Sequence, residues 1–86
     1  MTTVTDKIRE VIREGGALPV DIATLGDTDD LYAAGLTSHA TVNLMLGLEE
    51  KFDIEFPDRL LRRRTFESVA AIQAAITELL DEKVAA

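Results

Sequence analysis

Apolar residues recur at intervals of three or four positions in three separate stretches of this chain, and apolar–polar alternation is nowhere sustained. The first stretch places four apolar side chains on one side of a helix: Val4, Ile8, Val11 and Ile12. Gly15-Gly16 follows, and glycine readily adopts the left-handed conformation in which helices often end. We therefore predict an all-α chain whose first helix runs from Thr3 to Glu14.

Two further helices and one short helix are predicted in the second half of the chain. The second helix extends from Ser38, a candidate N-cap, to Phe52. Pro57-Asp58 opens a short helix that reaches Arg64, and the last helix spans 66–82 with Thr65 as its cap. The buried stripe of the last helix is expected to consist of Val69, Ile72, Ile76, Leu79 and Leu80.

A long connection, residues 16–37, separates the first two helices. It contains a capped helical turn with a glycine stop, 27–35, and six apolar anchors: Leu18, Val20, Ile22, Leu25, Leu31 and Tyr32. Long loops held down in this way more often carry function than fold. At 86 residues, the chain fits one domain, a small bundle of three main helices plus one short helix.

The charge is strongly acidic, with 16 acidic and 9 basic residues and a formal net charge of −7. This balance argues against nucleic acid as a partner, because duplex affinity depends on basic side chains that neutralise phosphates. Four of the nine basic residues fall within residues 59–64, which contain no acid. The composition indicates an acidic body with one arginine-rich segment.

Several classes are excluded by what the sequence lacks. No cysteine is present, which excludes disulfides, a cysteine nucleophile and thiolate metal sites. No apolar run is long enough for a membrane span, and the N-terminus lacks the form of a signal peptide. We expect a cytoplasmic monomer that does not bind membranes.

The second helix carries more apolar surface than a surface helix needs. Leu44, Leu48 and Met45 suffice to face a core, yet Val42 and Leu46 form a second arc in line with Ser38. Two interpretations remain open at this point. The long loop covers this second arc, or the arc is an exposed patch on which a partner docks.

Ser38 is the sharpest candidate for chemistry. A serine at a helix N-terminus is most often a cap, but the same position also stabilises an attached or bound phosphate. A hydrolase pairing with His39 is disfavoured, because adjacent helical residues do not face each other. No Gly-x-Ser-x-Gly elbow is present either.

Two charged clusters have plain interpretations. Asp27, Asp29 and Asp30 match no calcium loop, so we expect solvated side chains and no metal. The arginines of residues 59–64 have no nearby aromatic residue for base stacking. A solvated helix face, or a patch for an acidic protein or a phosphate-bearing ligand, fits them better.

Taken together, two segments resemble the acyl carrier protein family: Gly35-Leu36-Thr37-Ser38-His39 and Leu48-Glu49-Glu50-Lys51-Phe52 through Phe56-Pro57-Asp58. The resemblance extends in register over nearly the whole chain and implies a single carrier domain, residues 1–86. It implies that Ser38 is the attachment point of 4′-phosphopantetheine, taken from coenzyme A. The protein would then be no enzyme; its cargo would be a thioester on the arm's thiol, which accounts for a chain without cysteine.

The resemblance also implies partners: a phosphopantetheinyl transferase, a loading ligase and a downstream acyl acceptor enzyme. Val42, Leu46 and Glu49 occupy positions of the family's recognition helix. The family usually has Asp-Ser-Leu at the attachment site, whereas this chain has Thr37-Ser38-His39. The basic run Arg62–Arg64 is also atypical. We include Thr37, His39 and Arg62–Arg64 with the partner-binding residues.

These departures favour a carrier in a specialised pathway over a fatty-acid carrier. We predict a stand-alone aminoacyl carrier, loaded by a truncated ligase that resembles class II seryl-tRNA synthetases. The alternatives are a carrier of fatty-acyl or polyketide groups, and an unmodified helical adaptor that has kept the fold.

Overall fold

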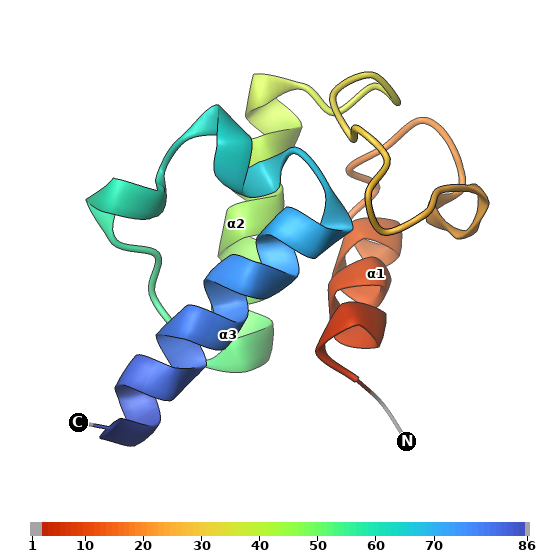
Figure 1. The fold of residues 1–86 in the computed structure, drawn as a ribbon. Coiled ribbons are helices and arrows are strands. Elements are labelled where there is room, and N and C mark those ends of the chain that lie inside the picture. Colours follow the sequence, from red (N-terminus) through yellow and green to blue (C-terminus); the bar gives the residue numbers. More distant parts are fainter. Residues whose placement is uncertain (1–2, 86) are drawn as a thin grey trace.

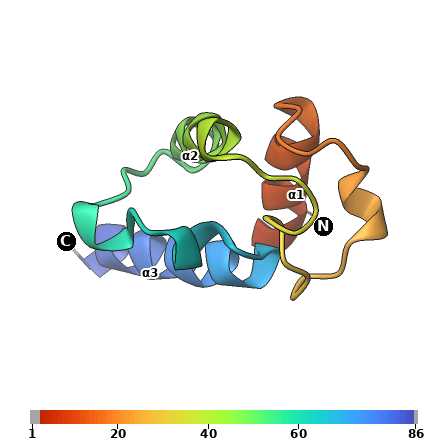
Figure 2. The same cartoon turned by 90° about the horizontal axis from the view of Figure 1, so that it is seen from above.

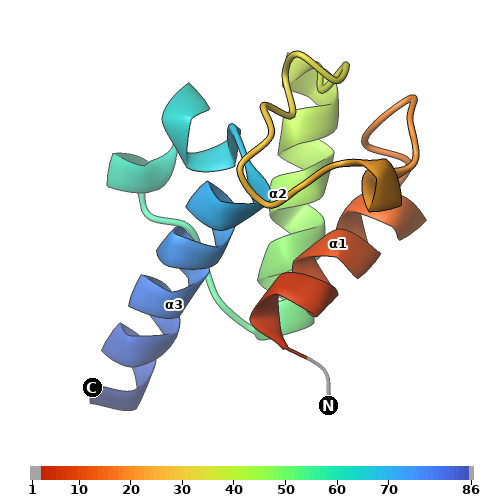
Figure 3. The same ribbon diagram turned by 45° about the vertical axis from the view of Figure 1, so that its right-hand side comes forward.

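The computed structural model describes residues 3–85 and contains three main helices, which form a small bundle (Figure 1). They are α1 (Val4–Glu14), α2 (Ser38–Phe52) and α3 (Val69–Ala85). α1 packs against both α2 and α3, and the connection from α1 to α2 passes over one end of the bundle (Figure 3). No strand occurs within residues 3–85, which confirms the all-α prediction.

Local signals set the bounds of α1. Thr3 caps its start in a reciprocal arrangement in which Asp6 N–H donates to Thr3 and the Asp6 carboxylate accepts from Thr3 N–H. Gly15 closes the last turn, and Gly16 takes a positive φ of 63°. The predicted helix therefore agrees with the observed one to within a residue.

The core lies where the three helices meet and is made almost wholly of aliphatic side chains. Each helix contributes fully buried residues: Ile8 and Ile12 from α1, Leu44 and Leu48 from α2, and Val69, Ile72 and Ile76 from α3. Phe56 and Phe66 extend this core, with ring centroids 5.5 Å apart at an interplanar angle of 56°. The predicted stripe of α3 is thus confirmed for Val69, Ile72, Ile76 and Leu79, whereas Leu80 is only half-buried against the core.

The long connection between α1 and α2 is held down at several points. Ile22 and Leu31 are buried as predicted, whereas Val20 is 46% exposed and anchors nothing. Leu31 N–H donates to Glu67 O, and Asp27 O accepts from Ala70 N–H, each at 2.8 Å. These bonds tie the connection to the start of α3.

An arginine of α1 ties down the same connection from below. Arg9 Nη1 donates to the carbonyls of Ile22 (3.0 Å) and Leu25 (2.9 Å), and its Nη2 pairs with Asp27. A guanidinium presents several donors in a fixed plane, so one side chain can hold three acceptors of a loop. The connection is therefore an ordered part of the bundle.

The segment between α2 and α3 differs from the prediction. In place of one short helix from 57 to 64 there are two 3₁₀ turns, η2 (Asp58–Leu60) and η3 (Arg63–Phe66). The last helix begins later than predicted, because Ser68 Oγ, and not Thr65, accepts from the N–H of the first turn, that of Ala71. Thr65 is buried inside η3. Viewed from above, this segment lies alongside α3 and faces α2 (Figure 2).

Acidic residues at the end of α2, which are unfavourable for the helix dipole, have structural partners. Glu49 Oε2 accepts from Phe56 N–H at 2.9 Å. Asp53 ends the helix in a left-handed conformation, and its carboxylate pairs with Lys83 of α3. The hydrogen bond from Lys83 holds the pKa of Asp53 below its usual value. None of the helices within residues 3–85 has the length and hydropathy that a bilayer crossing requires.

Candidate functional site

Two adjacent hydroxyl groups, those of Thr37 and Ser38, have different roles at the start of α2. Thr37, not Ser38, is the N-cap: its side chain accepts from Ala40 N–H at 3.0 Å, and its carbonyl accepts from Thr41 N–H. The prediction of Ser38 as the cap is therefore wrong by one residue. A threonine caps as a serine does, so local pattern alone did not separate the two.

Ser38 is the first helical residue and is exposed. Within the part of the chain that the structure describes, no hydrogen bond engages its hydroxyl. The chain has one other serine, Ser68, which is 8% exposed and caps α3 through its Oγ. Of the two serine hydroxyls, only that of Ser38 is open to an incoming reagent.

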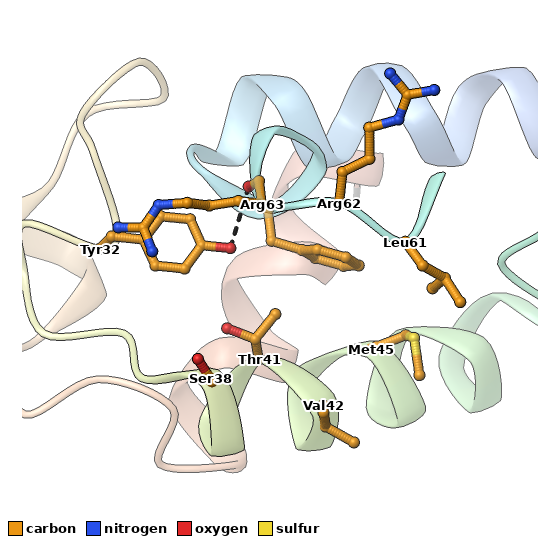
Figure 4. Close-up of a pocket in the computed structure, with 9 residues that line it drawn as sticks. Tyr32, Ser38, Thr41, Val42, Met45, Leu61, Arg62 and Arg63 are labelled. Atoms are coloured by element: carbon orange, nitrogen blue, oxygen red, sulfur yellow. Dashed lines mark hydrogen bonds between the residues drawn. The ribbon is translucent and has the colours of Figure 1, made fainter. Parts of the chain in front are cut away.

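Ser38 lies at one end of a groove of about 350 Å³ between α2 and the η2–η3 segment. From α2 the groove is lined by Thr41, Val42 and Met45, and from the opposite side by Leu61, Arg62, Arg63 and Phe66, with Tyr32 from the long connection (Figure 4). Its walls are mainly apolar. The serine hydroxyl is thus placed beside a groove that suits an extended, uncharged chain.

Val42 and Leu46 form an exposed patch on α2. Their exposed fractions are 52% and 53%, and Leu61 across the groove is 47% exposed. The long connection does not cover them, so the interpretation in which it buries this arc is wrong. The patch is small and lies on the same helix as Ser38.

The other predicted partner-binding residues of α2 are placed differently. His39 is exposed and does not line the groove. Glu49 is half-buried, and one of its oxygens is engaged by Phe56 N–H. The side chain of Thr37 serves the helix cap.

The arginine-rich segment is not one uniform patch. Arg59 pairs with Glu78 and Glu82 of α3, and the hydrogen bond to Glu78 raises the pKa of its guanidinium. Arg62 Nε donates to Arg59 O at 2.7 Å, and Arg64 is exposed. Arg63 stacks on Tyr32, with its guanidinium carbon 3.9 Å from the ring centroid.

The three aspartates of the long connection each have a separate task. Asp27 pairs with Arg9, Asp29 accepts from Gly26 N–H, and Asp30 caps the turn that follows by accepting from Tyr32 N–H. No cluster of metal-ligating side chains occurs among the residues that the structure describes. The carboxylates are thus engaged singly by their neighbours.

Sequence reasoning missed most of the groove's lining. Met45, which the sequence predicts on the core side of α2, lines the groove, and Tyr32 and Leu61 are not among the site residues that the sequence predicts. Tyr32 lies 31 positions from Arg63, and no short-range pattern connects them. The one available signal was Leu61, an apolar residue within a basic run.

Comparison with known proteins agrees with this geometry. Residues 6–81 match the family model described as "Phosphopantetheine attachment site". The chain is 54% identical over 79 residues to the aminoacyl carrier protein of Agrobacterium fabrum, which covers 92% of this chain and 95% of that protein. It is 32% identical to aminoacyl carrier protein 1 of Bradyrhizobium diazoefficiens, over 99% of this chain and 94% of the relative.

A solved structure is similar at the level of the fold as well. It is the carrier protein from Agrobacterium tumefaciens in complex with an engineered Bradyrhizobium japonicum glycine:[carrier protein] ligase and ATP. The TM-score is 0.85 at 50% identity, covering 88% of this chain and 99% of that chain.

The match over most of the chain implies a covalently attached 4′-phosphopantetheine as the cofactor. The family is one of carrier proteins. The extent of both similarities, together with a bundle that leaves a serine free beside an apolar groove, shows that this chain belongs to the phosphopantetheine-binding carrier proteins, within their aminoacyl carrier branch.

Proposed function

We propose that this protein bears an amino acid on 4′-phosphopantetheine attached to Ser38 and carries it from a loading ligase to a downstream acceptor enzyme. The observation that supports Ser38 is its free, exposed hydroxyl at the first position of α2 and at the end of the groove. The attached group supplies a thiol, which holds the cargo as a thioester. The chain itself performs no catalytic step.

The residues around Ser38 fit the group. A phosphodiester on its Oγ lies at the N-terminus of a fifteen-residue helix, where the helix dipole favours negative charge. Thr37 already caps the helix, so modification of Ser38 removes no hydrogen bond from it. The apolar walls beyond Ser38, Val42 and Met45 among them, offer contact to the uncharged part of the arm.

The attachment is tested by intact-mass measurement after incubation with coenzyme A and a broad-specificity phosphopantetheinyl transferase. The wild-type chain is expected to gain one phosphopantetheinyl group, and Ser38→Ala none. Ser68→Ala is the matched control: it removes the other serine, which caps α3, and is expected to gain the group normally. Equal gain by wild type and Ser38→Ala would overturn the proposal.

The proposed cargo is a small amino acid, with glycine the first to test. Its support is the similarity to a carrier crystallised with a glycine:[carrier protein] ligase, at 50% identity. Holo protein, ATP and ligases of this kind, including those built like seryl-tRNA synthetases, should produce an aminoacyl thioester that hydroxylamine cleaves. Loading with only fatty or malonyl groups would contradict the proposed cargo and leave the carrier role intact.

The proposed docking surface for the ligase and the transferase lies around the groove. It combines the exposed apolar patch of Val42 and Leu46 with the cations of Arg62 and Arg64, and His39 extends it along α2. Thr37 and Glu49, which have structural tasks, flank this surface. Apolar contact supplies affinity in such surfaces, and charge governs the rate of encounter.

Two substitutions test this surface separately. Leu46→Asn removes apolar contact without adding a charge and should slow loading by the ligase at any salt concentration. The double substitution Arg62→Glu, Arg64→Glu should slow loading most at low salt, because exposed charges are screened as salt rises. Both variants should keep the wild-type circular-dichroism spectrum, and unchanged loading by both would place the docking surface elsewhere.

A further inference from the structure

Tyr32 and Arg63 join two distant parts of the chain at the mouth of the groove. The Arg63 guanidinium carbon lies 3.9 Å from the centroid of the Tyr32 ring, within the range of a cation–π contact. The Tyr32 hydroxyl donates to the backbone carbonyl of Arg63 at 3.1 Å (Figure 4). Two contacts from one aromatic residue therefore fix both the backbone and the side chain of Arg63.

The donors at the edge of the Arg63 guanidinium have no acceptor among residues 3–85. Arg9 and Arg59, by contrast, have carboxylate partners, and Arg62 Nε donates to a carbonyl. Stacking uses the face of a guanidinium and leaves its in-plane N–H groups available. Arg63 is therefore an oriented cation whose hydrogen-bonding edge is not used within the described chain.

Arg63 and Ser38 line the same groove. In Figure 4 the Ser38 hydroxyl points toward the side of the groove where Arg63 lies over Tyr32, whereas the head of Arg62 points away from Ser38. The net charge of the whole chain is −7, whereas the charged side chains that line this groove, Arg62 and Arg63, are both cationic. Arg63 is the lining cation that faces an anion attached at Ser38.

We propose that Arg63, held in place by Tyr32, is a positioning residue that binds the phosphodiester of the arm attached at Ser38. A planar guanidinium can donate two parallel hydrogen bonds to phosphate oxygens, a geometry that an ammonium does not reproduce. Holding the phosphodiester at this end of the groove directs the rest of the arm along the apolar walls. This inference rests on the proposed attachment at Ser38.

The test uses holo protein and observes the phosphorus atom directly. We compare the ³¹P NMR resonance of the phosphodiester in wild type, Arg63→Gln and Arg64→Gln. Arg64→Gln is the matched control, since it removes the same charge one residue further on from a side chain that does not line the groove. Arg63→Gln should shift the resonance, and Arg64→Gln should leave it in place.

A second measurement is independent of the spectrum. If Arg63 binds the phosphodiester, attachment of the arm stabilises the wild-type chain, and the increase in Tm from apo to holo protein shrinks in Arg63→Gln. Tyr32→Leu, which removes both the ring face and the hydroxyl, should have the same effect as Arg63→Gln. High salt should diminish the wild-type increase, because the pair is near the surface.

The possible failures are distinguishable. A chain that gains no mass at Ser38 overturns the attachment and with it this inference. A chain that is modified normally, but whose ³¹P resonance and apo-to-holo Tm difference are the same in wild type and Arg63→Gln, overturns only the role of Arg63. Slower loading of Arg63→Gln with an unchanged ³¹P resonance would likewise overturn it and assign Arg63 to the docking surface.

Discussion

The two sides of α2 differ in how far their apolar side chains are buried. On the side that faces α1, Leu44 and Leu48 are buried, and the backbone at Gly47 approaches so closely that an added Cβ would lie 2.9 Å from Val11 Cγ1. Away from the core, Val42 and Leu46 remain about half exposed, and Val42 lines the open groove between α2 and the η2–η3 segment.

One helix can therefore pack against the core with one face and leave apolar side chains exposed to solvent on another. The packed side contributes most of the stability, because the free energy gained on folding increases with the apolar area removed from water. The open side leaves apolar area exposed, which is where we propose that the arm and the docking partners make contact. Substitutions should therefore separate by face: the packed side should affect unfolding, and the open side loading.

The largest effect is expected from Leu48→Ala on the packed side of α2. Leu48 is fully buried, and its truncation leaves a cavity, so the free energy of unfolding should fall by about 2–5 kcal/mol. Chemical denaturation followed by circular dichroism measures this loss. Leu46→Ala on the open side is the control and should change stability by no more than about 0.5 kcal/mol; equal losses would abolish the contrast between the two faces.

The next largest effect is expected from Gly35→Ala in the turn that leads into α2. Gly35 has a φ of 115°, and an added Cβ would lie 2.6 Å from Pro19 Cγ. The strained backbone alone should cost about 1–3 kcal/mol of unfolding free energy, measured by denaturation. Gly26→Ala is the control, because its Cβ would make only ordinary contact with Asp29, at 3.5 Å. A neutral Gly35→Ala would mean that this connection is loosely held.

A smaller effect is expected from Arg9→Gln, which removes the donors that hold the long connection. The carbonyls of Ile22 and Leu25 lose their charged partner, and stability should fall by about 1–2 kcal/mol. Hydrogen exchange should increase in the connection before it increases in the helices. Arg13→Gln, an exposed arginine of the same helix, should be close to neutral, and a similar loss there would point to a general charge effect.

The smallest effect concerns the Asp53–Lys83 pair, which is exposed and closes α2 onto α3. Because Lys83 lowers the pKa of Asp53, the pair stabilises the fold at pH above the ordinary value of 3.8. That contribution is lost as the pH falls through the lowered pKa of the folded state. NMR titration of the Asp53 carboxyl should show its pKa rising in Lys83→Gln; no change would show that the pair is not formed in solution.

The sequence predicted the parts of the fold that local signals determine. The bounds of α1 and α2 follow from caps and periodicity, as the Thr3 box and the left-handed Asp53 illustrate. The start of α3 was predicted too early, because Thr65 and Phe66 satisfy a helical pattern while they belong to a 3₁₀ turn. A pattern of apolar residues does not distinguish a tight turn from the first turn of a helix.

The candidate site was predicted only in part, because sequence patterns relate residues on one helix but not residues that tertiary packing brings together. Ser38 and the exposed patch of Val42 and Leu46 lie on one helix, where spacing alone relates them. The stacking of Arg63 on Tyr32 depends on how two connections meet in space. Contacts of that kind follow from tertiary packing, which no window of neighbouring residues contains.

Because Thr37 caps α2, the stability of the helix does not depend on whether Ser38 is modified. Were Ser38 itself the cap, every attachment or removal of a group would uncap the helix and fray its first turn. Thr37 is also uncharged, so it places no like charge next to an attached phosphodiester. If the arm is attached at Ser38 as proposed, the apo and holo chains therefore begin α2 with the same cap, and the helix keeps its first turn in both.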